Sequence, residues 1–193
     1  VGYISENNHG MTDGQNFTIT AWYKPYATGS SPSDEDINDL IFGFADSLPA
    51  HAVPASARPS MILGKTFAAG QLNFHLREAN DSQAAGRAVF TSTDIIEEQW
   101  NHIALVVSSS DNLNYNVRFS SNGVEHGNSS VTQVLGETHS LTTYDKFVVG
   151  GYISNAKYEE TKFRDVIVWD NALTLTQITD IAAASGDYNN VAF

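Results

Sequence analysis

The stretch Phe17–Lys24 reads FTITAWYK and decides the fold class of this chain. In an extended chain one face would carry Phe17, Ile19, Ala21 and Tyr23, and the opposite face would carry Thr18, Thr20 and Trp22. Such alternation with a period of two predicts a β-strand, because successive side chains of a strand point to opposite faces of the sheet. Pro25 follows and ends the strand, since proline has no N–H to donate to a neighbouring strand.

Similar stretches recur along the chain. We predict further strands at Leu40–Phe44, Met61–Lys65, Gln71–Arg77, Arg87–Thr91, Trp100–Ser108, Tyr115–Ser120, Lys146–Val149 and Lys162–Trp169. Continuous apolar character over Ile103–Val107 and Asp165–Trp169 predicts central strands that are covered on both faces. The turn-rich stretches are expected to be surface loops, and these are Ala27–Asp39, Asp46–Pro59 and Ser121–Thr138.

One segment alone has helical spacing. Its apolar residues are Leu173, Leu175, Ile178, Ile181 and Ala182. Thr174 and Gln177 fit a T-x-x-Q capping box at its start, and Gly186 is a stop signal. One short C-terminal helix after about ten strands predicts an all-β fold, a two-sheet antiparallel sandwich. The 193 residues suit a single domain with a substantial core.

The charge balance excludes several classes of partner. Lys and Arg number 10 against 22 Asp and Glu, which gives a formal net charge of -12. The electrostatic field of so negative a surface repels phosphate backbones and anionic lipids, so we predict neither nucleic-acid binding nor membrane docking. No apolar run reaches the length of a membrane span. The absence of cysteine excludes disulfides, thiolate zinc sites and a cysteine nucleophile. A metal cation or a neutral glycan remains compatible with the charge.

Four segments in order resemble the laminin-G-like or concanavalin A-like jelly-roll domains, in particular the branch found in bacterial, marine and phage surface proteins. The segments are FTITAWYKP at Phe17–Pro25, QWNHIALVV at Gln99–Val107, NVRFSSNGV at Asn116–Val124, and the closing strand and helix at Phe163–Ile181. The resemblance covers most of the chain and implies a jelly-roll sandwich. Within these segments we expect Trp22 and Trp100, like Trp169, to pack in the core, and Asn122-Gly123 to form a plain hairpin turn.

The two ends of the chain also bear on this resemblance. In the family, a strand with a Phe-Asp-Gly signature usually precedes the segment that Tyr3–Ser5 resembles, and here the chain begins at Val1 without it. The C-terminal Asn190–Phe193 is similar to the start of a returning strand. We therefore expect a single domain, residues 1–193, excised from a longer surface protein.

An acidic loop is the candidate metal site. Asp34, Asp36 and Asn38 place oxygen ligands at alternate positions, as a calcium loop begins. The sixth position is Asp39 rather than Gly, and the twelfth is Ala45 rather than Glu, so the loop is not an EF-hand. Calcium bound by these three residues and a solvated acidic loop both remain open.

A catalytic site is not evident in the sequence. Asp34-x-Asp36-x-x-Asp39 comes closest to the E-x-D-x-x-E-like spacing of jelly-roll glucanases, but it lies in a hydrophilic loop and has aspartate in place of both glutamates. The six histidines show no short metal-binding spacing, and no G-x-S-x-G elbow is present. We therefore predict that the domain is not an enzyme.

The remaining signal is a set of loop aromatics and amides suited to sugar rings. Neutral glycans are bound by aromatic faces together with planar amide hydrogen bonds. The candidate ligand-binding residues are Tyr26, Tyr144, Tyr152, Asn155 and Tyr158. Beside Tyr152, Gly150-Gly151 would let a ligand approach the backbone closely.

These observations predict a non-catalytic module that binds a neutral glycan or polysaccharide, or mediates adhesion, on an extracellular, cell or virion surface. One alternative is a structural decoration or appendage domain, for example of a phage capsid or tail, which packs on neighbouring subunits. A second alternative is a glycan-cleaving enzyme of the same fold. Function is inferred here from fold, and one fold hosts many functions.

Overall fold

The computed structural model describes residues 4–7, 16–25, 39–45, 60–65, 71–77, 86–91, 94–109, 114–132, 146–150 and 162–185. Within them lie the strands β1 Ile4–Asn7, β2 Phe17–Lys24, β3 Asp39–Ala45, β4 Ser60–Lys65, β5 Gln71–Arg77, β6 Gly86–Thr91, β7 Asn101–Ser109, β8 Asn114–Ser121, β9 Val124–Thr132, β10 Lys146–Val149 and β11 Lys162–Trp169. The helix α1 spans Leu175–Ser185. No helix among the described residues is long and apolar enough to cross a membrane.

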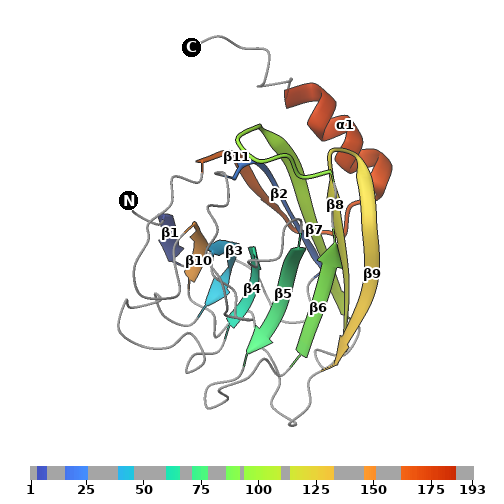
Figure 1. Ribbon diagram of the computed structural model, residues 1–193. Coiled ribbons are helices and arrows are strands. Elements are labelled where there is room, and N and C mark those ends of the chain that lie inside the picture. The colour runs from blue at the N-terminus through green and yellow to red at the C-terminus, as the bar shows by residue number, and fades with distance from the viewer. Residues whose placement is uncertain are drawn as a thin grey trace.

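The strands form two facing antiparallel sheets (Figure 1). One has six strands in the order β1-β10-β3-β4-β5-β6, and the other has five in the order β11-β2-β7-β8-β9. In each sheet, strands that are distant in sequence lie side by side, as when β10 separates β1 from β3. This confirms the predicted jelly-roll sandwich with one C-terminal helix.

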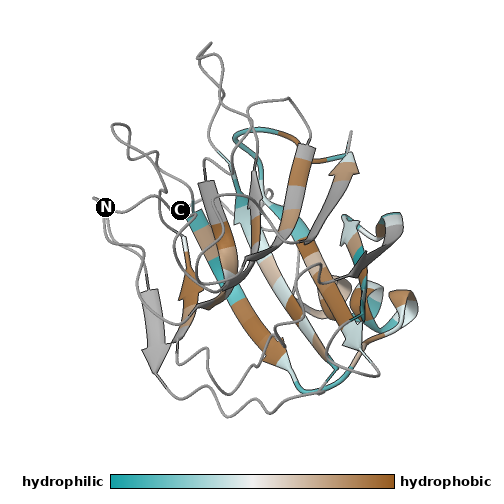
Figure 2. Ribbon diagram, turned by 90° about the horizontal axis from the view of Figure 1, so that it is seen from below, coloured by the Kyte–Doolittle hydropathy of each residue, from teal (hydrophilic) through white to brown (hydrophobic). Residues whose placement is uncertain are grey.

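The main core lies between the sheets, and β2 supplies one wall of it. Phe17, Ile19, Ala21 and Tyr23 are buried there, as the alternation predicted. The ring of Phe17 meets that of Phe44 from β3 edge-on, at 5.2 Å between centroids, so aromatic contacts join the two sheets. Hydrophobic residues recur along the described strands in Figure 2.

A second, smaller core lies on the outer face of the five-stranded sheet, beneath α1. Its buried members are Ala104, Val106, Leu173 and Ile178. The Gln177 N–H donates to Thr174 Oγ1 at 3.3 Å and the Thr174 N–H donates to Gln177 Oε1 at 2.9 Å, which confirms the predicted capping box.

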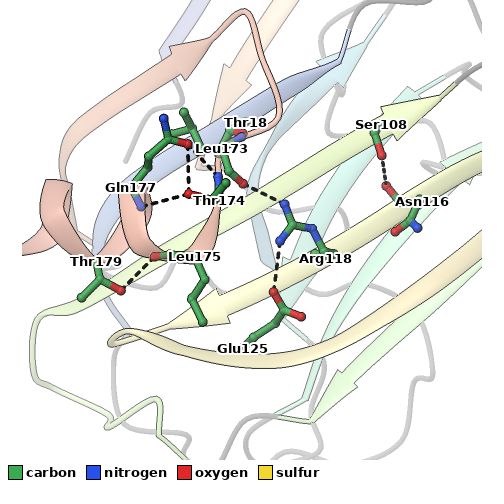
Figure 3. Close-up of polar contacts among 10 residues, drawn as sticks. All are labelled: Thr18, Ser108, Asn116, Arg118, Glu125, Leu173, Thr174, Leu175, Gln177 and Thr179. Atoms are coloured by element: carbon green, nitrogen blue, oxygen red, sulfur yellow. Dashed lines mark hydrogen bonds and ion pairs between the residues drawn. The ribbon is translucent and has the colours of Figure 1, made fainter.

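Polar contacts hold the segment that precedes the helix against the five-stranded sheet (Figure 3). The Leu173 N–H donates to Thr18 Oγ1 at 2.9 Å, and Arg118 Nη2 donates to the Leu173 carbonyl at 2.7 Å. Arg118 also pairs with Glu125 of β9, at 3.2 Å from Nη1 to Oε2. These bonds attach the segment just before the helix to β2 and β8.

The prediction of a central strand at Asp165–Trp169 is wrong. β7, which contains Ile103–Val107, is the middle strand of its sheet as predicted, but β11 is an edge strand. A bulge between Arg164 and Ile167 shifts the register of β11 against β2. The bulge interrupts the period-two alternation of β11, so apolar residues become adjacent in the sequence. This continuous apolar pattern resembles that of a central strand that is covered on both faces.

The prediction of a loop over Ser121–Thr138 is also wrong in part, because β9 occupies Val124–Thr132. The sequence VEHGNSSVT is polar and contains glycine, which is typical of a loop. β9 is the edge strand of its sheet and pairs with β8. Val124, Glu125 and Gly127 are exposed, so polar residues in this part of the strand remain in contact with water.

Two turns depend on residues with positive φ. Asn122 and Gly123 have φ of 49° and 82° and join β8 to β9 as the predicted two-residue hairpin turn. Gly150 has a φ of 70°, and a Cβ there would lie 3.3 Å from Phe163 Cε2. The group that approaches the Gly150 backbone closely is therefore the phenyl ring of Phe163.

Candidate functional site

The predicted binding residues lie outside the described part of the chain. This holds for the candidate ligand-binding residues Tyr26, Tyr144, Tyr152, Asn155 and Tyr158 and for the candidate calcium ligands Asp34, Asp36 and Asn38. Their roles therefore stay predictions. Among the residues that the structure does describe, no group of three or more histidine, aspartate or glutamate side chains is placed to hold a metal ion.

The segment from Asp94 to Trp100 is held in shape by the buried side chain of Asn101, the first residue of β7. The Asn101 amide nitrogen donates to the carbonyls of Ile96 at 2.9 Å and Gln99 at 2.8 Å. Its oxygen accepts from the Ile96 N–H at 2.9 Å. One side chain thus satisfies three backbone groups, and the segment reaches the sheet in a fixed geometry.

We expect Asn101→Asp to lower the free energy of unfolding by about 2 kcal/mol. The aspartate carboxylate can still accept from the Ile96 N–H, but it cannot donate to the carbonyls of Ile96 and Gln99. These two carbonyl oxygens then face a buried negative charge. Chemical denaturation followed by circular dichroism measures this change. The matched control is Asn116→Asp, the same substitution at an exposed position of β8, which should stay within about 0.5 kcal/mol of the parent. Equal effects at both positions would contradict the assigned role of Asn101.

The hairpin turn is tied to the same segment. The Asn122 Nδ2 group donates to the Asp94 carbonyl at 2.7 Å and to Asn101 Oδ1 at 3.1 Å. Its Oδ1 accepts from the His102 N–H at 3.0 Å. On the other side, the Glu98 N–H donates to the Pro25 carbonyl at 2.7 Å, with Glu98 at a φ of 59°. The segment is therefore anchored to β2, β7 and the β8–β9 turn.

Ser121, His126 and Asp94 meet at this end of the sandwich. Ser121 Oγ lies 2.7 Å from His126 Nε2, and Asp94 Oδ2 lies 3.6 Å from the same nitrogen. A serine–histidine–aspartate relay instead uses the two opposite ring nitrogens, one for each partner. Ser121 is also 0% exposed, so a substrate could not reach its oxygen. The trio fits a structural link between hairpin and segment, and its geometry does not match nucleophilic catalysis.

On the outer face of the five-stranded sheet, the register brings aromatic and basic side chains together. β11 and β2 pair Lys162 with Lys24 and Arg164 with Trp22. β2 and β7 pair Trp22 with His102 and end at the Tyr23–Asn101 pair, which Lys24 follows on one strand and Trp100 precedes on the other. Directly opposed residues share a face of the sheet. We call the six residues Lys24, Lys162, Arg164, Trp22, Trp100 and His102 the outer-face array.

Contacts between the side chains support this arrangement. The Arg164 guanidinium carbon lies 5.0 Å from the centroid of the Trp100 ring, within cation–π range. The rings of Trp22 and His102 meet edge-on at 5.4 Å. Lys162 is exposed, while Lys24, Trp100 and Arg164 are half-buried.

The three tryptophans, all expected in the core, have different surroundings. Trp22 is buried as expected, although on the outer face of the sheet, and Trp169 packs against the second core with its Nε1 donating to Thr20 Oγ1 at 3.0 Å. Trp100 is only half-buried, next to Arg164. A partly exposed indole on a rigid sheet is a surface on which the C–H face of a sugar can stack.

His102 lies in the buried layer of the array. Its side chain is 2% exposed, and within the described residues its Nδ1 has no hydrogen-bond partner. Burial lowers the pKa of the His102 imidazole from 6.5 to about 4, because desolvation disfavours the charged ring. At neutral pH the ring is therefore uncharged and serves as a packing partner of Trp22.

Sequence reasoning did not single out the array. One signal was available, since the alternation of β2 puts Lys24 on the same face as Trp22. The alternation of β11 likewise groups Lys162 with Arg164. The pairing of these two strands, which are about 140 positions apart, was not visible without the tertiary structure.

The fold is a two-sheet antiparallel β-sandwich. The chain belongs to the concanavalin A-like lectin/glucanases superfamily, because the Laminin_G_3 family model matches residues 2–179. This confirms the resemblance seen in the sequence. No curated protein matches the chain.

Solved structures of similar fold include proteins of quite different size. A heptameric SAP-like pentraxin from Limulus polyphemus is 20% identical with a TM-score of 0.53, and the match covers 89% of this chain and 71% of the pentraxin. The binding domain of botulinum neurotoxin serotype G is 12% identical with a TM-score of 0.61, over 95% of this chain and 40% of that domain. A Trypanosoma rangeli sialidase is 15% identical with a TM-score of 0.57, over 89% of this chain and 23% of the sialidase. At these identities the matches show the fold alone.

Proposed function

We propose that this domain is a non-catalytic glycan-binding or adhesion module that acts outside the cell, on a cell surface or on a virion. The observation that carries the proposal is the half-buried Trp100, which lies immediately before β7 and next to the Arg164 guanidinium. Sugar-binding surfaces commonly combine an aromatic face, which stacks on the sugar ring, with hydrogen-bond donors for its hydroxyl groups.

Two further observations support the proposal. The superfamily contains lectins, and the neurotoxin match is titled a binding domain, so proteins of this fold do serve as recognition modules. The segment that presents Trp100 is held by Asn101, which reduces the ordering that a ligand would have to impose. Glucanases share the fold as well, and the geometry of the Ser121–His126–Asp94 trio speaks against hydrolysis at that position.

Trp100→Ala tests this function. The substitution should weaken glycan binding at least about tenfold, equivalent to about 1.4 kcal/mol, because the ligand loses its stacking surface. A glycan array of the parent domain, with and without calcium, identifies the ligands, and titration calorimetry then measures each variant. Ile96→Ala is the matched control, because it removes an exposed apolar side chain from the same segment. Unchanged melting temperatures would show that both variants are folded.

Two results would contradict the proposal. One is an array without hits for the folded parent domain, and the other is equal glycan affinity of the parent domain and Trp100→Ala. A second candidate function, assembly with neighbouring subunits, is favoured by Ile96 and Val124, which are 51% and 48% exposed. The Asn122–Asp94 hydrogen bond joins the two segments that carry these residues. A silent array together with a symmetric oligomer in solution would favour assembly.

A further inference from the structure

Two lysines face each other across neighbouring strands in the outer-face array. Lys24 of β2 is directly opposite Lys162 of β11. Directly opposed residues of antiparallel strands have Cβ atoms about 5 Å apart, and like charges in such a pair are destabilising. Within the described residues, no carboxylate forms an ion pair with either lysine. The pair is an unfavourable arrangement for the free domain, and a bound anion would relieve it.

The surroundings make this pair unusual for the chain. The whole protein has 10 Lys and Arg against 22 Asp and Glu, yet Arg164 lies two residues from Lys162 on the same strand. Carboxylates occur nearby in sequence, Glu97 and Glu98 in the segment before β7 and Asp165 after Arg164. The surroundings of the array are therefore of mixed charge, and neither Lys24 nor Lys162 forms an ion pair with a carboxylate among the described residues.

We propose that the outer-face array binds an anionic glycan, with a carboxylate or sulfate group between Lys24 and Lys162 and a sugar ring on Trp100. This inference rests on the proposed glycan-binding function and specifies the class of its ligand. It departs from the neutral glycan that the overall charge predicted. Lysine ammonium groups bind carboxylate and sulfate oxygens through charge-assisted hydrogen bonds. Trp100 contacts Arg164, which lies two residues from Lys162 on β11, so the indole and the lysine pair belong to the same part of the outer face.

The net charge of -12 does not prevent such binding. At physiological ionic strength the Debye length is about 8 Å, so distant carboxylates are largely screened while two adjacent lysines act directly on the anion. The same screening predicts a salt dependence. Affinity for an acidic glycan should fall as sodium chloride is raised, whereas affinity for a neutral glycan held by stacking should change little.

The test compares two doubly substituted domains of equal net charge. Lys24→Gln with Lys162→Gln removes the opposed pair, and Lys65→Gln with Lys146→Gln removes two lysines from strands β4 and β10 of the other sheet. The probes are a heparin-derived oligosaccharide, an oligogalacturonate and a malto-oligosaccharide, which carry sulfate, carboxylate and no charge respectively. Titration calorimetry at low and high salt measures each affinity, and melting curves confirm that each variant is folded.

We expect the Lys24/Lys162 variant to bind at least one acidic probe about tenfold or more weakly than the parent, while the Lys65/Lys146 variant binds it as the parent does. Preference for heparin or for galacturonate then distinguishes sulfate from carboxylate. Binding of the neutral probe that depends on Trp100 but not on the lysines would overturn this inference and retain the proposed function. An equal loss of affinity in both double variants would also overturn this inference, and so would the absence of binding to any of the three probes. The broader glycan array tests the proposed function separately.

Discussion

Phe119→Ala should lower the free energy of unfolding by about 3 to 5 kcal/mol, the largest effect expected of any single substitution considered for this domain. Phe119 projects from β8 into the main core and is 0% exposed. Its ring lies 5.6 Å from that of Phe90 in β6, which belongs to the opposite sheet, and 5.9 Å from that of His126. Truncation therefore removes apolar burial and opens a cavity where the two sheets meet.

Urea denaturation monitored by tryptophan fluorescence or circular dichroism measures this loss. Phe119→Leu retains most of the side-chain volume and should cost less than half as much. Ile167→Ala is the surface control, because Ile167 is 39% exposed on the outer face and its truncation should cost about 1 kcal/mol or less. A loss below about 1 kcal/mol for Phe119→Ala would show that the ring is not in the intersheet core.

Acidification should destabilise the domain through His102 by about 3 kcal/mol between pH 7 and pH 4. The pKa of His102 is lowered from 6.5 to about 4 by burial in the folded domain. Between these two values the unfolded chain binds a proton that the folded protein excludes, so stability falls as pH falls. Above pH 6.5 both states are neutral at this ring, and below about pH 4 the folded protein is protonated too, so the loss is confined to this window.

The variant His102→Phe isolates this effect. A phenyl ring retains the contact with Trp22, and Nδ1 loses no hydrogen bond among the described residues because it has none there. Unfolding free energies of parent and variant are compared at pH 7, 5.5 and 4, so that the titration of carboxylates cancels in the difference. The parent should lose about 3 kcal/mol more than the variant. Parallel pH profiles of the two proteins would show that His102 titrates normally in the folded state.

The second core and the outer-face array lie on the same side of the sandwich. Trp22 and His102 form the buried layer of the array, and His102 precedes Ala104 and Val106, which pack against the helical segment. Lys24 and Lys162 therefore share a face of the sheet with packed side chains, and rigid surroundings limit the entropy that ligand binding would cost. Packed aromatic side chains beside lysines are consistent with a site that stacks one sugar ring and contacts its charged group.

Much of the fold could be predicted from local patterns. The period-two alternation of Phe17–Lys24 assigned every side chain of β2 to the face that it occupies, since that strand has no bulge. The Thr174 and Gln177 pair predicted the start of the helix region, because capping depends only on neighbours in sequence. Asn122-Gly123 predicted its turn, because both positions need positive φ.

The errors arose where a pattern depends on strand order. β9 looks like a loop because polar residues are tolerated at a sheet edge, and β11 looks central because its bulge at Asp165 interrupts the alternation. In both cases the neighbouring strand, rather than the local sequence, decides what the side chains meet.

The sequence by itself therefore determined the sandwich, its helix and the family to which the chain belongs, because alternation, capping and turn chemistry are local properties. Only the tertiary structure decided that Lys24 faces Lys162 and that Arg164 lies over Trp100. These contacts join β2, β11 and the start of β7, segments that are roughly 60 to 140 residues apart and meet only through the order of strands in the sheet. The net charge of -12 is a sum over the whole chain, whereas the charge that a ligand meets depends on which few side chains the sheet brings together.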